Sequence, residues 1–80
     1  MKTYKVTVDE RGTICWYNKK GEYHREDGPA IEYTNGTKYW CQNGIFHREN
    51  GPAVEESNGT KQWYLNGKEL TEKEFNTNEK

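Results

Sequence analysis

The sequence is poor in aliphatic residues and has no excess of charge of one sign. Val, Ile and Leu together fill only eight of the 80 positions, and no apolar run is long enough for a signal peptide or a membrane span. The 12 basic and 13 acidic residues are mixed along the chain, so no charged block is available to bind phosphates or to imitate nucleic acid. Two cysteines are too few for a disulfide scaffold. We therefore expect reduced thiols and a cytoplasmic protein.

Aromatic residues provide most of the apolar surface. The chain contains three Trp, six Tyr and two Phe, whereas 31% of its residues are charged. Large rings bury much area per residue, and disordered chains are poor in them. These proportions predict an ordered, thin structure whose side chains are half-buried on a sheet. Binding of a partner or of a second copy would complete their burial.

A repeat of 23 residues organises the chain. The residues HREDGPA at 24–30 return as HRENGPA at 47–53. A first, degenerate copy carries one extra residue, which lies in the loop 18–21. The tryptophans follow the same spacing, at Trp16, Trp40 and Trp63. Periodicity of this kind indicates a repeat architecture.

The eight glycines mark the turns between short strands. They are separated by seven to nine residues, and five of them follow Asn, which is typical of tight hairpin turns. This spacing predicts roughly eight or nine short antiparallel strands in a sharply twisted meander. No segment before residue 70 has room for a helix.

The two ends of the chain depart from the repeat. Residues 4–8 are predicted to form an N-terminal strand, and residues 71–74 match a capping box. The capping box predicts a short helix over 72–76, with Leu70 and Phe75 covering the last strands, because repeat arrays need atypical ends. We predict one domain over residues 1–80, with an N-terminal strand segment at 1–11, repeats at 12–70, and a helical cap and tail at 71–80.

The repeating unit resembles the MORN repeat. It carries Trp-x-x-Asn-Gly-x-x-His, then Gly, then a further Asn-Gly turn, and the likeness covers roughly residues 12–70. A closer likeness is to a MORN-like variant with His-Arg-Glu-Asp/Asn-Gly-Pro-Ala, which occurs in phage and large-virus proteins. The resemblance implies hairpins stacked into one twisted sheet, and a phage protein acting in the host cytoplasm. The variant motif replaces the His-Gly-x-Gly of the standard unit, so a lipid-binding role does not carry over.

Strand alternation divides the aromatic residues between two faces of the predicted sheet. The three tryptophans lie on one face, where we expect them to form the core. The opposite face carries tyrosines and the two cysteines, and an exposed aromatic surface of this extent is typical of interfaces. Arg is also favoured at binding hot spots. The candidate partner-binding residues are therefore Tyr17, Arg25, Tyr39, Arg48 and Tyr64.

The two His-Arg pairs, at 24–25 and 47–48, are candidates for catalysis or metal binding. A catalytic imidazole needs a nucleophile or an orienting carboxylate in a cleft. Because the pair recurs with the architecture, we expect each His to bond a turn carbonyl and each Arg to pair with a carboxylate of the neighbouring unit. A zinc site with Cys15 and Cys41 would lack the tightly spaced ligand pairs of structural zinc sites. We predict no catalytic residues, no metal and no cofactor.

Together these features predict a non-enzymatic protein-binding module without a membrane partner. The resemblance extends this prediction to a small phage protein that binds and inhibits a host protein of antiviral defence. One alternative is a structural homo-oligomer, such as a homodimer formed through exposed strands or the tyrosine face. Another is a single-stranded nucleic-acid binder that uses Lys5, Lys38 and Lys61 on one surface, although the net charge of −1 disfavours it.

Overall fold

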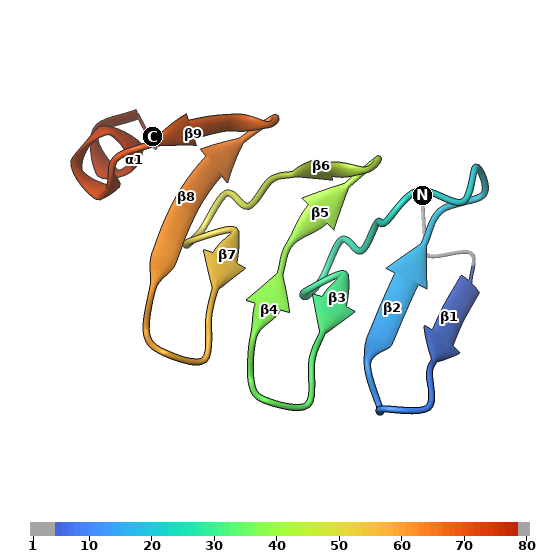
Figure 1. Cartoon of the computed structure of the whole chain (residues 1–80). Helices are drawn as coiled ribbons and strands as arrows, with labels where there is room; N and C mark the ends of the chain where they lie inside the picture. Colours follow the sequence, from blue (N-terminus) through green and yellow to red (C-terminus); the bar gives the residue numbers. More distant parts are fainter. Residues whose placement is uncertain (1–4, 79–80) are drawn as a thin grey trace.

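Residues 5–78, the part of the chain that the computed structural model describes, form nine short strands and one helix. The strands are β1 (Lys5–Val8), β2 (Ile14–Tyr17), β3 (Ile31–Glu32), β4 (Lys38–Tyr39), β5 (Cys41–Gln42), β6 (Ile45–Phe46), β7 (Val54–Glu55), β8 (Lys61–Leu65) and β9 (Lys68–Leu70), and the helix is α1 (Glu72–Asn78). The elements follow one another in a row from β1 at one end to α1 at the other (Figure 1). The all-β prediction with a C-terminal helix is confirmed. Residue 4, predicted to begin the first strand, lies outside the described residues.

Seven strands form one antiparallel sheet in the order β1-β2-β3-β4-β7-β8-β9, and β5 and β6 form a separate two-stranded sheet. The prediction of a single sheet is therefore wrong in this respect. The main sheet loses its pairing beyond Trp40, whose N–H still donates to the Ala53 carbonyl at 2.7 Å. The residue before Ala53 is Pro52, which has no N–H to continue the ladder. Past that point, among the described strands, β5 pairs with β6 alone, across the Asn43-Gly44 turn.

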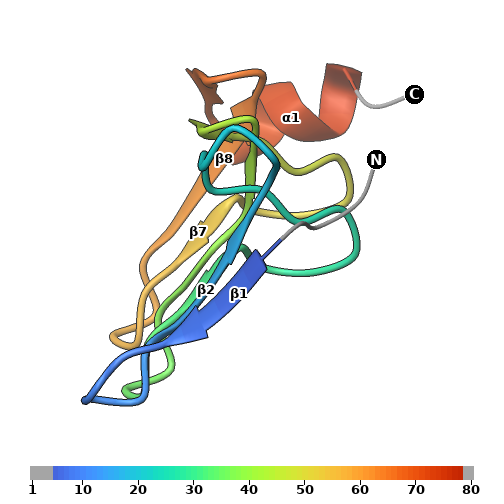
Figure 2. The ribbon, with the colours of Figure 1, turned by 90° about the vertical axis from the view of Figure 1, so that its right-hand side faces the viewer.

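The molecule is thin, with principal extents of 38 × 30 × 16 Å. Viewed along the row of strands, the sheet is narrow at one end and the chain spreads at the other (Figure 2). At the wide end the turns of the β5–β6 and β8–β9 hairpins lie to one side, and the loops that contain Gly-Pro lie to the other side together with α1. A sheet this thin leaves both faces available for contacts.

Turn chemistry explains the short strands. Asn43 and Gly44 have φ values of 52° and 82°, and Asn66 and Gly67 have 52° and 83°. Two successive residues with positive φ define the two-residue hairpin turn that Asn-Gly favours, because Asn tolerates this conformation and Gly has no Cβ to oppose it. These turns fix the β5–β6 and β8–β9 hairpins.

Buried residues lie on both faces of the sheet. The buried apolar residues among those described are Ala30, Ile31, Cys41, Ala53, Val54, Leu70 and Phe75, whereas the three tryptophans are only half-buried. Ile31 pairs with both Cys15 and Tyr39, and Tyr39 pairs with Val54, so these residues share one face. On the other face Leu70 pairs with Trp63, and the carbonyls of the buried Ala30 and Ala53 accept hydrogen bonds from the N–H groups of Trp16 and Trp40. The tryptophan face therefore holds part of the core, as predicted, and the tyrosine face, which was predicted to lie outside the core, holds the rest. The tyrosine rings cover small aliphatic residues on their own face, and arginines cover two of the tryptophans on the other.

The C-terminal cap forms as the capping box predicts. The Thr71 N–H donates to Glu74 Oε1 at 2.9 Å, and the Glu74 N–H donates to Thr71 Oγ1 at 3.0 Å. Leu70 and Phe75 are buried, and α1 packs against β8 and β9. The helix extends two residues beyond the predicted end at residue 76. This cap covers the last hairpin, at the position where a further His-Arg loop would follow.

Candidate functional site

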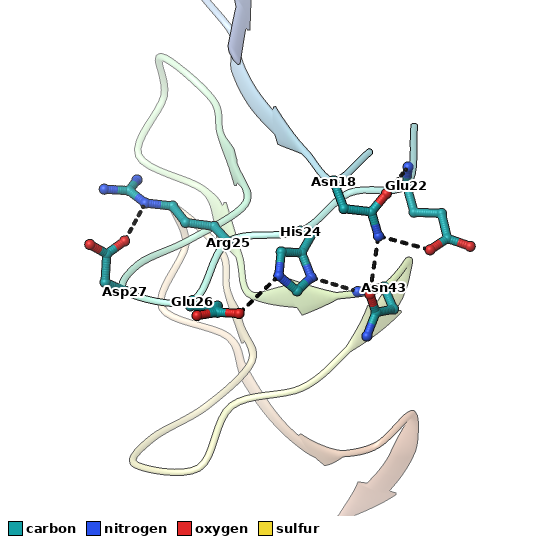
Figure 3. Close-up of polar contacts among 7 residues, drawn as sticks. All are labelled: Asn18, Glu22, His24, Arg25, Glu26, Asp27 and Asn43. Carbon is teal, nitrogen blue, oxygen red and sulfur yellow. Dashed lines mark hydrogen bonds and ion pairs between the residues drawn. The ribbon is translucent and has the colours of Figure 1, made fainter. Parts of the chain in front are cut away.

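His24 joins its own loop to the next hairpin turn (Figure 3). Its Nδ1 accepts a hydrogen bond from the Asn43 N–H at 3.0 Å, and its Nε2 lies 3.4 Å from Glu26 Oε2. An amide N–H can only donate, so Nδ1 is the unprotonated nitrogen and Nε2 carries the hydrogen that faces the carboxylate. The histidine therefore bonds a turn amide rather than the turn carbonyl we predicted.

The same link between a His-Arg loop and the next hairpin turn, which we call a joint, recurs 23 residues later. His47 Nδ1 accepts from the Asn66 N–H at 2.9 Å, and its Nε2 lies 3.3 Å from Glu49 Oε2. Main-chain bonds accompany both joints, since the N–H groups of the following arginines donate to the carbonyls of Cys41 and Tyr64, each at 3.1 Å. Both nitrogens of each imidazole thus have partners within the chain.

Arg25 and Arg48 lie flat on tryptophan rings. The Arg25 Cζ is 3.7 Å from the centre of the Trp16 ring, and the Arg48 Cζ is 3.7 Å from the centre of the Trp40 ring. A glycine backbone, that of Gly28 or Gly51, lies close to each guanidinium. A Cβ at Gly51 would lie only 3.0 Å from the Arg48 Cζ, so a side chain there would displace the guanidinium. The glycine before each Pro therefore leaves space for the stacked arginine.

The arginines pair with carboxylates of their own unit. Arg48 Nη1 donates to the Pro52 carbonyl at 3.0 Å and to Glu55 Oε2 at 3.1 Å. Arg25 Nε donates to Asp27 Oδ1 at 3.2 Å, on the same loop. Our prediction of a carboxylate from the neighbouring unit is wrong, because each loop curls back over the strand that follows it. Most of the polar groups in the His-Arg-Glu-x-Gly-Pro motif hold this loop.

An open groove of about 770 Å³ lies between the two His-Arg loops. Its walls combine arginines from both loops with acidic side chains and Trp40. Within residues 5–78, no group of three or more His, Cys, Asp or Glu side chains is arranged to hold a metal ion. The contacts of Arg25 and Arg48 with a partner stay a prediction.

Six aromatic side chains form what we call the aromatic face. Its members are Tyr17, Tyr23, Tyr33, Tyr39, Phe46 and Tyr64. The Tyr17 and Tyr23 rings stack with centroids 5.4 Å apart. The other four form a chain in which neighbouring centroids are 5.6, 5.5 and 5.0 Å apart. The three predicted tyrosines thus belong to one larger surface.

Sequence reasoning missed three members of this face. Tyr33 has the same orientation as Ile31, two residues earlier, so strand alternation would have identified it. Tyr23 and Phe46 lie on return segments, opposite Tyr17 and Cys41 respectively. Pairing across the predicted turns was the signal that would have found them.

The aromatic face is half open to solvent. Tyr23 and Tyr33 are each 40% exposed, while Ile31, Cys41 and Val54 are buried on the same face of the sheet. Partial burial raises the pKa of both exposed tyrosines, with smaller contributions from neighbouring tyrosines and cysteines, so their hydroxyls stay neutral donors. Burial also raises the pKa of the Cys41 thiol to about 11. This face offers rings and hydroxyl groups above an apolar layer.

The opposite face is charged across the middle of the sheet. Lys38 pairs directly with both Glu32 and Glu55, and Glu55 pairs with Lys61. Lys5 pairs with Tyr17 and therefore belongs to the aromatic face. The prediction that these three lysines line one surface is wrong, because the register places Lys5 on the other side of the sheet. Two of the three lie among carboxylates, which weakens any attraction for a phosphate backbone.

No protein-family model matches this chain, and comparison with curated proteins and with solved structures also gives no match. In the described part of the chain, no helix has the length and apolar character needed to cross a membrane. Function is therefore inferred from the surfaces described above.

Proposed function

We propose that this protein is a non-enzymatic binding module that recognises another protein through its aromatic face. The observation that carries the proposal is the aromatic face of six side chains. Its exposed members lie on a hydrogen-bonded sheet. Tyrosine has few rotatable bonds, combines apolar area with a hydroxyl, and is enriched at protein interfaces. A surface of this kind loses little conformational entropy when a partner binds.

The polar residues support a framework role rather than catalysis. Both imidazoles use each of their nitrogens within the chain, and both guanidinium groups are stacked on tryptophan and bonded to a proline carbonyl. A general base needs a free nitrogen within reach of a substrate proton. These contacts favour a rigid scaffold that presents the aromatic face.

We extend the proposal to the kind of partner on the basis of the repeat motif. Its His-Arg-Glu-Asp/Asn-Gly-Pro-Ala unit is similar to MORN-like repeats of phage proteins. On that ground the partner is a host protein, such as a component of antiviral defence, and the module inhibits it by occupying its surface. Such an inhibitor needs a tight interface and no chemistry of its own.

Affinity capture with matched variants tests the proposal. The Tyr23→Ala/Tyr33→Ala variant removes the two most exposed rings, and Lys38→Ala/Lys61→Ala removes two side chains from the opposite face. A specific host protein should be captured by the unaltered chain and by the lysine variant, and lost by the tyrosine variant. Circular dichroism should show that both variants are folded. Equal capture by all three chains would contradict the proposal.

Self-association is the second candidate, because the aromatic face also fits a second copy of the same face. Sedimentation equilibrium decides between them. A homodimer that dissociates in the Tyr23→Ala/Tyr33→Ala variant, without capture of any other protein, would assign the face to self-assembly. A monomer at high concentration would exclude that role.

A further inference from the structure

The first strand presents an open sheet edge with two different faces. In the part of the chain that the structure describes, β2 is the only strand that pairs with β1, so the outer side of β1 is unpaired. Val6 and Val8 are 46% and 65% exposed on the tryptophan side of the sheet. Lys5 and Thr7 point to the aromatic face. An unpaired edge of this kind is a template for an added strand.

The turn next to this edge differs in sequence from the two Asn-Gly hairpin turns. The loop 18–21 contains two exposed lysines, Lys19 and Lys20, whereas the turns at 43–44 and 66–67 contain only Asn and Gly. The longer loop closes on itself, because Asn18 Oδ1 accepts hydrogen bonds from the N–H groups of Lys20 and Glu22, at 2.9 and 3.0 Å. The Asn18 side chain also donates to Asn43 Oδ1 at 3.0 Å (Figure 3). These hydrogen bonds hold the loop without using the side chain of either lysine.

These lysines and the β1 edge share a groove of about 400 Å³. The groove is lined by Lys5, Thr7, Tyr17, Asn18, Lys19, Lys20 and Gly21. Three of these side chains are basic, and within the described residues none of the lining side chains is acidic. The nearest carboxylate in the loop, that of Glu22, accepts a hydrogen bond from Asn18 Nδ2 at 2.9 Å. Three ammonium groups around one groove repel each other and favour an anionic ligand.

We propose that the β1 edge binds an extended segment of a protein partner whose side chains alternate between acidic and apolar. Added as a strand, such a segment directs its carboxylates to the groove and its apolar side chains to Val6 and Val8, because strand side chains alternate between faces. The proposal rests on the proposed function, since it names the chemistry of a segment of that partner. It adds a second contact surface, continuous with the aromatic face through Tyr17.

The two exposed valines and the lysines together select this occupant. A second copy paired edge to edge would bring the lysine groups of both chains toward each other, and Lys at a sheet edge is a known device against self-pairing. A single-stranded nucleic acid would satisfy the lysines but would leave the valines without apolar contacts. Only an alternating acidic and apolar strand satisfies both faces of β1.

Titration with defined peptides, followed by amide NMR shifts, tests the proposal on the isolated protein. The probe is a capped heptapeptide in which Glu and Val alternate, with a Glu and Ser peptide, a Lys and Val peptide and an oligothymidylate of eight nucleotides as comparisons. The Glu and Val peptide should shift the amides of residues 5–8 and 17–21 and slow hydrogen exchange along β1. Its affinity should fall as salt rises, because ion pairs at an exposed groove are screened.

Two charge-reversal variants locate the site. Lys19→Glu/Lys20→Glu should weaken the Glu and Val peptide by about tenfold or more, since each exposed ion pair contributes a modest free energy that becomes repulsion. The control variant Lys68→Glu/Lys73→Glu has the same net charge but alters the far end of the molecule, and it should bind like the unaltered chain. Three results would overturn the proposal: equal loss of affinity for the Glu and Val peptide in both variants, binding of the Glu and Ser peptide as tight as that of the Glu and Val peptide, or tighter binding of the oligothymidylate.

This experiment is independent of the aromatic face. If the peptide fails to bind while a partner is still captured through the tyrosines, the edge proposal fails and the proposed function stands. If the peptide binds but no partner depends on the tyrosines, the edge proposal stands as a peptide site and the proposed function fails.

Discussion

The joint at His24 gives the sharpest test of the view that the His-Arg motif is a framework. The side chain is buried, with only 6% of the residue exposed, and it accepts the Asn43 N–H from 19 residues further along the chain. His24→Ala removes this acceptor and leaves space where the ring was. Losing one hydrogen bond costs about 1 kcal/mol, and truncating a mostly buried side chain costs about 1–2 kcal/mol more. We therefore expect a loss of about 2–3 kcal/mol in the free energy of unfolding.

The measurement is urea unfolding followed by tryptophan fluorescence, supported by thermal unfolding. A domain of this size unfolds about 4–8 °C lower for each kcal/mol lost, so the midpoint should fall by roughly 8–24 °C. His24→Asn is the matched control, because its side-chain oxygen can take the place of Nδ1 as acceptor for the Asn43 N–H. We expect it to recover about 1 kcal/mol relative to His24→Ala.

Two results would refute the reasoning. One is a destabilisation below about 0.5 kcal/mol for His24→Ala, the size of an ordinary surface substitution. The other is equal stability of the Ala and Asn variants, which would mean that the acceptor contributes nothing. Below its unfolding temperature, His24→Ala should still capture the same partner, because the joint supports the aromatic face without belonging to it.

Two further predictions concern the arginine stack and the buried thiol. Gly51→Ala should destabilise the protein by about 1–2 kcal/mol, because its Cβ would meet the Arg48 guanidinium on Trp40, and the loss should largely vanish in an Arg48→Ala background. A full loss in that background, measured by urea unfolding, would show that the stack is not the cause. Cys41 in the native protein should react with iodoacetamide at pH 8 roughly a hundredfold more slowly than in the unfolded chain, because raising the pKa from 9.0 to about 11 lowers the thiolate fraction by that factor. Equal reaction rates in the native and the unfolded chain, measured by peptide mapping, would exclude a buried thiol. The stabilising contribution of the neutral thiol is complete below pH 9 and is lost as pH rises from 9 through 11.

Local chemistry alone determined the turns, the strand pattern and the C-terminal cap. The Asn-Gly pairs at 43–44 and 66–67 require positive φ, and they form the predicted hairpins. Thr71 and Glu74 bond each other's backbone as their spacing predicts. In these cases the residues that interact lie within a few positions of each other, so the sequence contains the whole interaction.

The tertiary structure decided how each face is covered and where the charged groups meet. Alternation separates Trp from Tyr, but it does not say that the loops curl back to place Arg25 on Trp16 and Arg48 on Trp40. The partner of His24 is an amide in the next hairpin, and Lys5 reaches the groove beside Lys19 and Lys20 only through the pairing of β1 with β2. These contacts depend on the path of loops and on strand register, which join residues that are distant in the sequence. The turns and the members of the aromatic face were therefore predictable, whereas the stacking of arginine on tryptophan and the lysine groove became visible only in the folded chain.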